Sequence, residues 1–137
     1  MSRSMEAYRG VAFPWHCDGM GHVSTRFYTG WFDEASYHLI AHLTGWSGAT
    51  QGGLGWADVQ RVVEYQQELH ADDLFVIHSS VDKLGTNSLT TRHELRKLDG
   101  SIIAVDTMTS VRFNLETRRG VEIELELRNT VEEWLSA

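Results

Sequence analysis

The chain has 137 residues, of which 42% are hydrophobic, and a formal net charge of -7, which fits one globular domain spanning residues 1–137 with a modest core. The acidic balance and the lack of a Lys/Arg stripe argue against nucleic-acid binding. Because no apolar stretch is long enough for a bilayer span or a secretory signal, we expect a cytoplasmic protein without membrane contact. The single cysteine, Cys17, excludes an internal disulfide and a cysteine-based metal cluster.

A long helix dominates the first half of the predicted structure. It follows a strand that ends near Phe13, and Ser24 is the expected N-cap. Apolar residues then recur at steps of three and four along one helical face. They are Tyr28, Trp31, Phe32, Ala35, Leu39, Leu43 and Trp46. Gly45 and Gly48 mark the predicted end, and the glycine-rich segment 45–55 indicates a flexible connection.

After Gly55 the periodicity changes to that of strands. A first strand is expected with alternate residues on one face, namely Val59, Arg61, Val63, Tyr65, Gln67 and Leu69. Three runs rich in β-branched residues follow, at Leu74–Lys83, Thr86–Leu98 and Ser101–Leu115. Turn signals at Leu84-Gly85 and Asp99-Gly100 join them, so the sequence predicts consecutive antiparallel hairpins.

The C-terminal segment carries mixed signals. A short strand at Val121–Leu125 and a helix from about Arg128 both fit it. One long helix with an antiparallel meander indicates an α+β class in which the sheet curls around the helix and buries its apolar face.

The loop before the helix contains the residues with the clearest chemical meaning. The stretch WHCDGMGHVSTRFY places Asp18 and His22 in a glycine-rich loop that runs into the helix. A helix start offers unpaired N–H groups and a positive dipole end. A carboxylate there could attack a substrate or activate water while the amides stabilise an oxyanion, so the loop is a candidate hydrolytic centre.

These residues carry a family resemblance. The order of elements, the loop Asp18 to Val23 and the WFDEA run at Trp31 to Ala35 resemble the hotdog-fold acyl-CoA thioesterases of the 4-hydroxybenzoyl-CoA thioesterase type. The resemblance runs from about Val11 to Phe113. It implies a hotdog fold, an antiparallel β-sheet wrapped around a long central α-helix. This sequence departs from the family pattern at Ser24 and Thr25, where many relatives have an asparagine pair.

The resemblance also implies roles for individual residues. Asp18 matches the family's catalytic aspartate, as nucleophile or general base. The oxyanion donor would be a backbone N–H near Thr25 or Arg26, with His22 orienting the acyl group or the loop. In the run LGTNS, Ser88 matches a turn that lies close to the acyl or CoA portion across the dimer in relatives. We therefore expect Asp18, His22 and Thr25 to be catalytic, and Arg26 and Ser88 to bind substrate.

The predicted activity is hydrolysis of an acyl- or aryl-CoA thioester to the free acid and CoA, without a cofactor. Because exposed sheet edges are commonly covered by another subunit, we expect a homodimer or homotetramer. Two alternatives remain: a hotdog enoyl-thioester hydratase or dehydratase, and a non-catalytic acyl-thioester-binding module.

Other residues have simpler interpretations. His38 and His42 have a zinc-compatible spacing but lack the glutamate of a metalloprotease motif, so no metal site is expected. The aromatic residues of the helix could line an aromatic acyl pocket, but packing in the core is the expected role. They are Tyr28, Trp31, Phe32, Tyr37 and Trp46. Basic side chains are candidates for holding the CoA phosphates. They are Lys83, Arg92, Arg96 and Arg112.

Overall fold

The computed structural model describes residues 3–45 and 52–136. Its elements, in chain order, are β1 (Ser4–Val11), the 3-10 helix η1 (Pro14–His16), α1 (Thr25–Leu43), β2 (Leu54–Tyr65), β3 (Leu74–Leu84), β4 (Ser88–Lys97), β5 (Ile102–Asn114), β6 (Arg119–Gly120) and α2 (Leu125–Ser136). None of the described helices is long and apolar enough to cross a membrane.

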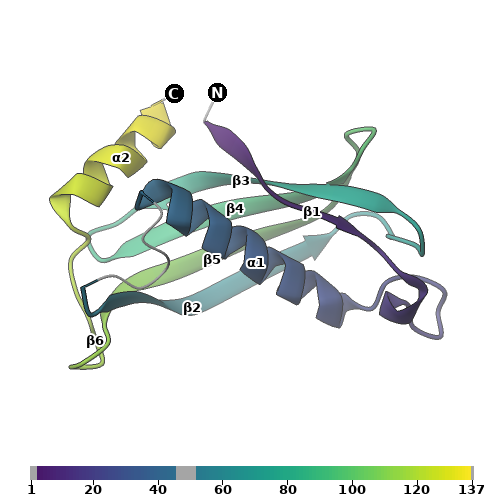
Figure 1. Cartoon of the computed structure of the whole chain (residues 1–137), viewed down its shortest axis with the longest axis horizontal. Helices are drawn as coiled ribbons and strands as arrows, with labels where there is room; N and C mark the ends of the chain where they lie inside the picture. Colours follow the sequence, from purple (N-terminus) through teal and green to yellow (C-terminus); the bar gives the residue numbers. More distant parts are fainter. Residues whose placement is uncertain (1–2, 46–51, 137) are drawn as a thin grey trace.

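The strands form one antiparallel sheet in the order β1-β3-β4-β5-β2, with the short β6 paired to the end of β5. The sheet curves behind α1, and α2 covers the end of the sheet near the C-terminus of α1 (Figure 1). The predicted α+β arrangement, a long helix held against an antiparallel meander, is therefore confirmed.

The predicted apolar face of α1 is the face that packs on the sheet. Phe32, Ala35 and Leu39 are fully buried, and Tyr28, Trp31 and Leu43 are at most 8% exposed. Ser24 occupies the N-cap position, although its side chain makes no capping hydrogen bond. The expected helix end is also correct, since Gly45 follows the helix with φ of +73°. Trp46, Gly48 and most of the predicted flexible connection lie outside the described residues.

The hairpin prediction is correct for β3, β4 and β5, but β2 differs from expectation. A register shift between Asp58 and Gln60 makes a bulge that changes which residues face inward. Val59 is consequently 61% exposed, whereas Trp56 and Asp58 before the bulge line the space under α1. The strand also ends at Tyr65, so Leu69, which is fully buried, packs from the following loop.

The C-terminal expectation was partly wrong. No strand forms at residues 121–125; the two-residue β6 ends at Gly120, and Val121 N adds one further bond to Arg112 O at 2.8 Å. The helix begins at Leu125, three residues before the expected start. The segment between them passes under the β3–β4 turn, because Ile123 N donates to Thr86 O at 3.0 Å. The Ile123 N–H is therefore not free for the ladder hydrogen bond that a strand at 121–125 would need.

Candidate active site

The loop that contains Asp18 is closed by its own backbone. Asp18 N donates to His22 O at 3.0 Å, and Gly21 N donates to Asp18 O at 3.1 Å. Gly21 has φ of +84°, a conformation that a side chain would strain. The Asp18 carboxylate accepts a hydrogen bond from Met20 N at 2.9 Å. The half-buried side chain is thereby held in a tight Asx turn.

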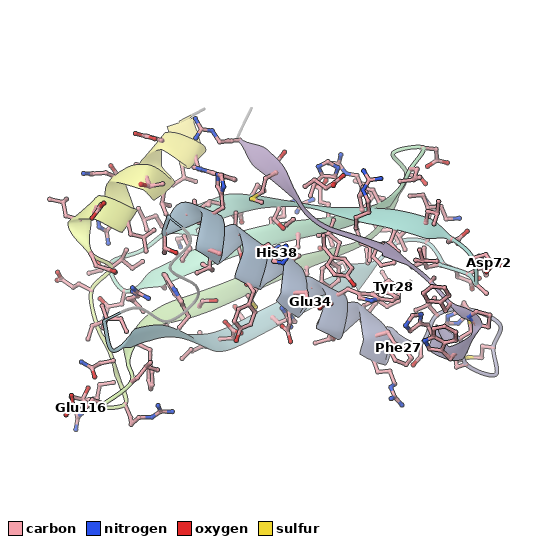
Figure 2. The ribbon with its side chains drawn as sticks, viewed as in Figure 1. Phe27, Tyr28, Glu34, His38, Asp72 and Glu116 are labelled. Carbon is pink, nitrogen blue, oxygen red and sulfur yellow. The ribbon has the colours of Figure 1, made fainter. Side chains whose placement is uncertain are left out.

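The same loop is fastened to the start of α1. Ser24 N donates to His16 O at 2.9 Å, and Val23 N donates to Leu69 O at 2.8 Å. Figure 2 shows Phe27 and Tyr28 at the end of α1 next to this loop. Asp18 is therefore close in the chain to the N-terminal end of α1, which carries free N–H groups. Backbone hydrogen bonds hold its loop to that end of the helix.

His16, which precedes the Asp18 loop, packs against the first turns of α1. Its Nδ1 accepts a hydrogen bond from Phe13 N at 2.8 Å. Its ring meets Phe27 and Trp31 edge-on, with centroids 4.8 and 5.1 Å apart. Partial burial lowers the pKa of His16, which favours a neutral imidazole.

Of the other predicted site residues, His22 is hydrogen-bonded to Asp18 through the backbone, and Thr25 and Arg26 follow in the chain. His22 is half-buried, and its Nδ1 donates to Val23 O at 3.1 Å, which ties the ring to its own backbone. Thr25 and Arg26 are the first two residues of α1 and both are exposed. The Arg26 guanidinium carbon is 4.8 Å from the centre of the Phe27 ring.

Ser88 lies at the opposite end of the fold. It is the first residue of β4 and pairs with Val111 near the start of β2. Figure 1 shows the β3–β4 turn beside α2, away from η1. Because α1 has 19 residues, about 28 Å of helix separates the two ends. Ser88 and Asp18 are thus not neighbours within one chain.

Three of the four basic candidates for phosphate binding are already paired. Arg92 and Arg96 both bind Glu94. The Arg112 side chain is 2% exposed and holds both carboxylate oxygens of Glu124, at 2.8 and 2.7 Å. Arg112 was therefore wrongly placed among the phosphate ligands, because it is a buried structural cation. Lys83 remains exposed.

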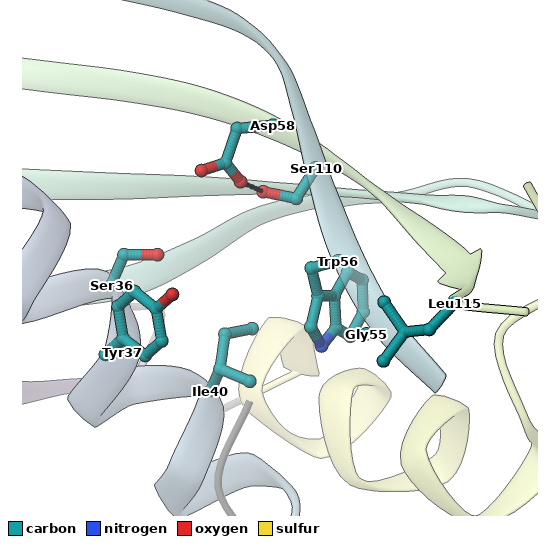
Figure 3. Close-up of a pocket in the computed structure, with 8 residues that line it drawn as sticks. All are labelled: Ser36, Tyr37, Ile40, Gly55, Trp56, Asp58, Ser110 and Leu115. Atoms are coloured by element: carbon teal, nitrogen blue, oxygen red, sulfur yellow. Dashed lines mark hydrogen bonds between the residues drawn. The ribbon is translucent and has the colours of Figure 1, made fainter. Parts of the chain in front are cut away.

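A cavity of about 110 Å³ lies farther along α1, between that helix and strands β2 and β5. Ser36 and Tyr37 line it from α1, and Trp56, Asp58 and Ser110 line it from the sheet (Figure 3). Ser110 Oγ donates to Asp58 Oδ1 at 2.8 Å. Asp18 does not line this cavity.

Apart from Tyr37, no cavity residue could be identified from the sequence pattern. Asp58 and Ser110 are 52 positions apart and meet only through the β2–β5 register. Of the helix aromatics, Tyr28, Trp31 and Phe32 are core residues as expected, whereas Tyr37 is 63% exposed at the cavity mouth. Within the described ranges, no group of three or more His, Cys, Asp or Glu side chains could hold a metal ion.

Comparison with known proteins agrees with this architecture. The long-chain acyl-CoA thioesterase FadM of Escherichia coli (strain K12) is 22% identical over 122 residues, which cover 88% of this chain and 92% of that protein. A hypothetical protein from Staphylococcus aureus, solved in complex with CoA, has a TM-score of 0.84 at 13% identity. The match covers 99% of this chain and 86% of that protein's chain.

A gentisyl-coenzyme A thioesterase structure has a TM-score of 0.76 at 21% identity, covering 94% of this chain and 99% of that chain. The expected hotdog fold is thereby confirmed. The family model of the thioesterase-like superfamily matches residues 11–135, nearly the whole chain. The protein therefore belongs to the thioesterase-like superfamily.

Proposed function

We propose that this protein is an acyl-CoA thioesterase that hydrolyses an acyl- or aryl-CoA thioester to the free acid and CoA. The observation that carries the proposal is the position of Asp18, fixed in an Asx turn whose backbone is bonded to the N-terminal end of α1. The family supports thioester chemistry, and the turn supplies the carboxylate that this chemistry needs.

Hydrolysis can proceed in two ways at such a site. In one, Asp18 takes a proton from water, and the hydroxide adds to the thioester carbonyl. In the other, Asp18 itself adds, and water then cleaves the mixed anhydride. In both, the negative oxygen faces amides near Thr25 or Arg26, and collapse expels the CoA thiolate. Because a thiolate is a good leaving group, one carboxylate is enough.

We also propose a homodimer joined through β2. On this sheet β2 is an edge strand of 12 residues, and Val59, Val62 and Tyr65 on it are 61, 50 and 47% exposed. Such an edge favours pairing with a second copy. A two-fold axis through the middle of β2 would run the two α1 helices antiparallel.

That pairing would build a site from two subunits. Arg61, near the middle of β2, donates a hydrogen bond to Asp33 of α1. Asp33 is therefore the α1 residue that lies level with the proposed two-fold axis. Thr25 lies eight residues, or about 12 Å, to one side. Ser36, Tyr37 and the cavity lie on the other side, as does Ser88. The partner's loop with its Asp18 would therefore face the cavity and Ser88 of this chain.

The test is release of free CoA thiol from a panel of acyl-, aryl- and enoyl-CoA thioesters. Asp18→Asn should lower kcat by about a thousandfold, the usual contribution of a positioned acid–base group. Asp99→Asn is the matched control, because Asp99 Oδ1 accepts from Ser101 N at 2.9 Å in an equivalent turn between β4 and β5. Wild-type activity is expected for the control.

Other outcomes of this test would contradict the proposal. Hydration of enoyl-CoA without thiol release would make the protein a hydratase. Binding of acyl-CoA without any turnover would make it a binding module. Full thiol release by Asp18→Asn would remove Asp18 from the mechanism.

A further inference from the structure

We propose that His16 is a positioning residue for Asp18, and that its neutral imidazole holds the base of the Asp18 loop against the start of α1. The inference rests on the proposed thioesterase function, because Asp18 is the carboxylate of that proposal. His16 acts through the backbone of the loop and not on the substrate.

The Asp18 loop lies within a short hairpin formed by residues 16–24. Its two arms are bridged at Cys17 and Val23, and Ser24 N donates to His16 O at 2.9 Å at the base. Asp18 stands on the first arm, and the second arm runs directly into α1 after Ser24. The base of the hairpin therefore sets the distance between the carboxylate and the helix amides that the proposed reaction needs.

Three hydrogen bonds meet at His16. His16 N donates to Phe13 O at 2.9 Å, which closes the turn of η1, and His16 O accepts from Ser24 N. The third bond comes from the side chain, because Nδ1 accepts from Phe13 N at 2.8 Å. His16 therefore fastens η1 on one side and the hairpin on the other.

The ring of His16 adds contacts with α1. It lies edge-on to Phe27 and Trp31, with centroids 4.8 and 5.1 Å apart. Trp31 is 8% exposed and belongs to the hydrophobic core under α1. Through these two rings the base of the hairpin is held to the packed part of the molecule.

Only one protonation state of His16 fits this arrangement. A backbone N–H donates and cannot accept, so Nδ1 carries a lone pair and the neutral ring has its hydrogen on Nε2. Protonation would bring a second N–H against Phe13 N, 2.8 Å away, and this hydrogen bond would be lost. Burial lowers the pKa of His16, so the neutral form persists to lower pH than in a free histidine, whose pKa is about 6.5.

The surroundings of the His16 ring are aromatic. Within the described residues its ring has no hydrogen bond to a charged side chain. Protonation therefore opens the base of the hairpin and forms no ion pair in exchange. Several charged or titratable groups stand on the segments packed against it, namely Cys17, Asp18 and His22 in the loop and Arg26, whose guanidinium packs on Phe27, in α1.

The experiment measures kcat and KM from about pH 5 to 8 for wild type, His16→Asn and His16→Phe, with the best thioester of the CoA-release panel. The asparagine oxygen stands where Nδ1 stands and accepts from Phe13 N, but it is never protonated. Phenylalanine keeps a ring against Phe27 and Trp31 and has no acceptor. The two variants thus separate the hydrogen bond from the packing.

We expect His16→Asn to keep kcat within about threefold of wild type at neutral pH, because the hydrogen bond is retained. It should also lose less activity than wild type on acidification. His16→Phe should lower kcat by about ten- to a hundredfold, with KM within about twofold, because a misplaced catalytic group slows the reaction more than it weakens binding. Any acid loss that remains in His16→Asn belongs to other groups of the site.

His78→Asn is the matched control. His78 follows the buried Ile77 in β3 and so lies on the face of the sheet turned away from α1. This variant should leave kcat and the pH profile unchanged. Thermal unfolding checks that all variants are folded.

A measurement without substrate separates this inference from the proposed function. Amide hydrogen exchange of Ser24, followed by NMR, reports whether the base of the hairpin is closed. The protection of this amide should fall on acidification in wild type, stay high in His16→Asn and be low in His16→Phe.

If this exchange pattern holds but no thioester is cleaved, the role of His16 in holding the loop stands and the thioesterase proposal fails. If thioesters are cleaved while wild type and His16→Asn have parallel pH profiles, the thioesterase proposal stands and the role of His16 is overturned. Equal protection of Ser24 in all the variants also overturns it.

Discussion

Arg61 and Asp106 join β2 to β5 through a hydrogen bond of 2.9 Å from Nε to Oδ1, inside the space between the sheet and α1. Asp106 is fully buried, and its Oδ2 has no partner among the described residues. The row of inward-facing residues across β3, β4 and β5 at this level is polar, with Ser79 and His93 beside Asp106. The centre of this hotdog sheet therefore contains two buried titratable groups with opposite responses to pH.

Asp106 should make the fold less stable as pH rises. Burial raises its pKa to about 6, although Arg61 attracts the ionised form. The folded state thus holds a proton that the unfolded state has lost between about pH 4 and 6. The free energy of unfolding falls through that window, by about 3 kcal/mol in total. Carbon-detected NMR titration should find this carboxyl near pH 6; a titration below pH 4 would contradict the prediction.

His93 should act in the opposite direction. Burial, followed by the charge of Arg61, lowers its pKa to about 3, and its ring bonds Ser79 and Thr91. Below about pH 6.5, the usual pKa of histidine, this imidazole is protonated in the unfolded chain but stays neutral in the folded chain. The free energy of unfolding therefore falls with acidification. The loss from this residue is about 2 kcal/mol between pH 6.5 and 5.

These two effects oppose each other between pH 4 and 6, which gives a test with two variants. Urea unfolding is measured across this range for wild type, Asp106→Asn and His93→Gln. Asp106→Asn should lose stability more steeply than the wild type on acidification, and His93→Gln should gain stability relative to it. Parallel pH profiles for all three proteins would show that neither group titrates as described.

Glu124 should be worth more to stability than its exposed position indicates. Its side chain is 40% exposed, but it neutralises the buried Arg112, whose other side-chain hydrogen bond among the described residues goes to Gly55 O. Glu124→Ala leaves that cation buried, at an expected cost of about 3 kcal/mol in the free energy of unfolding. Glu122→Ala, a neighbouring exposed glutamate, should cost less than about 0.5 kcal/mol. Chemical denaturation measures both, and equal losses would show that the pair adds nothing.

Two glycines should respond to alanine with opposite signs. A Cβ at Gly30, within α1, would meet no atom of the described residues within 4 Å, so their packing does not require glycine there. Gly30→Ala should stabilise the protein by up to about 1 kcal/mol. Gly21→Ala should destabilise by about 1–2 kcal/mol, because its φ of +84° strains a side chain. Loss of stability in Gly30→Ala would indicate a close neighbour supplied by a second subunit.

Much of the fold could be predicted from the sequence because its signals are local. The α1 face from Tyr28 to Leu43 follows from a helical period, and the β3–β5 hairpins follow from alternation and glycine turns. The errors have non-local causes. The bulge at Asp58 depends on pairing with β5, and the early start of α2 depends on Ile123 reaching the β3–β4 turn.

By itself the sequence determined the α+β arrangement of a long helix on an antiparallel sheet and the loop that holds Asp18 before the helix, since helical period, strand alternation and turn residues are local signals. Its resemblance to a known family indicated the hotdog fold. The tertiary structure alone decided that Arg112 is buried against Glu124 and that Asp58 and Ser110 line the same cavity as Ser36. The two hydrogen-bonded pairs lie 12 and 52 positions apart in the chain, and only the register of the sheet and the placement of α1 bring such residues together.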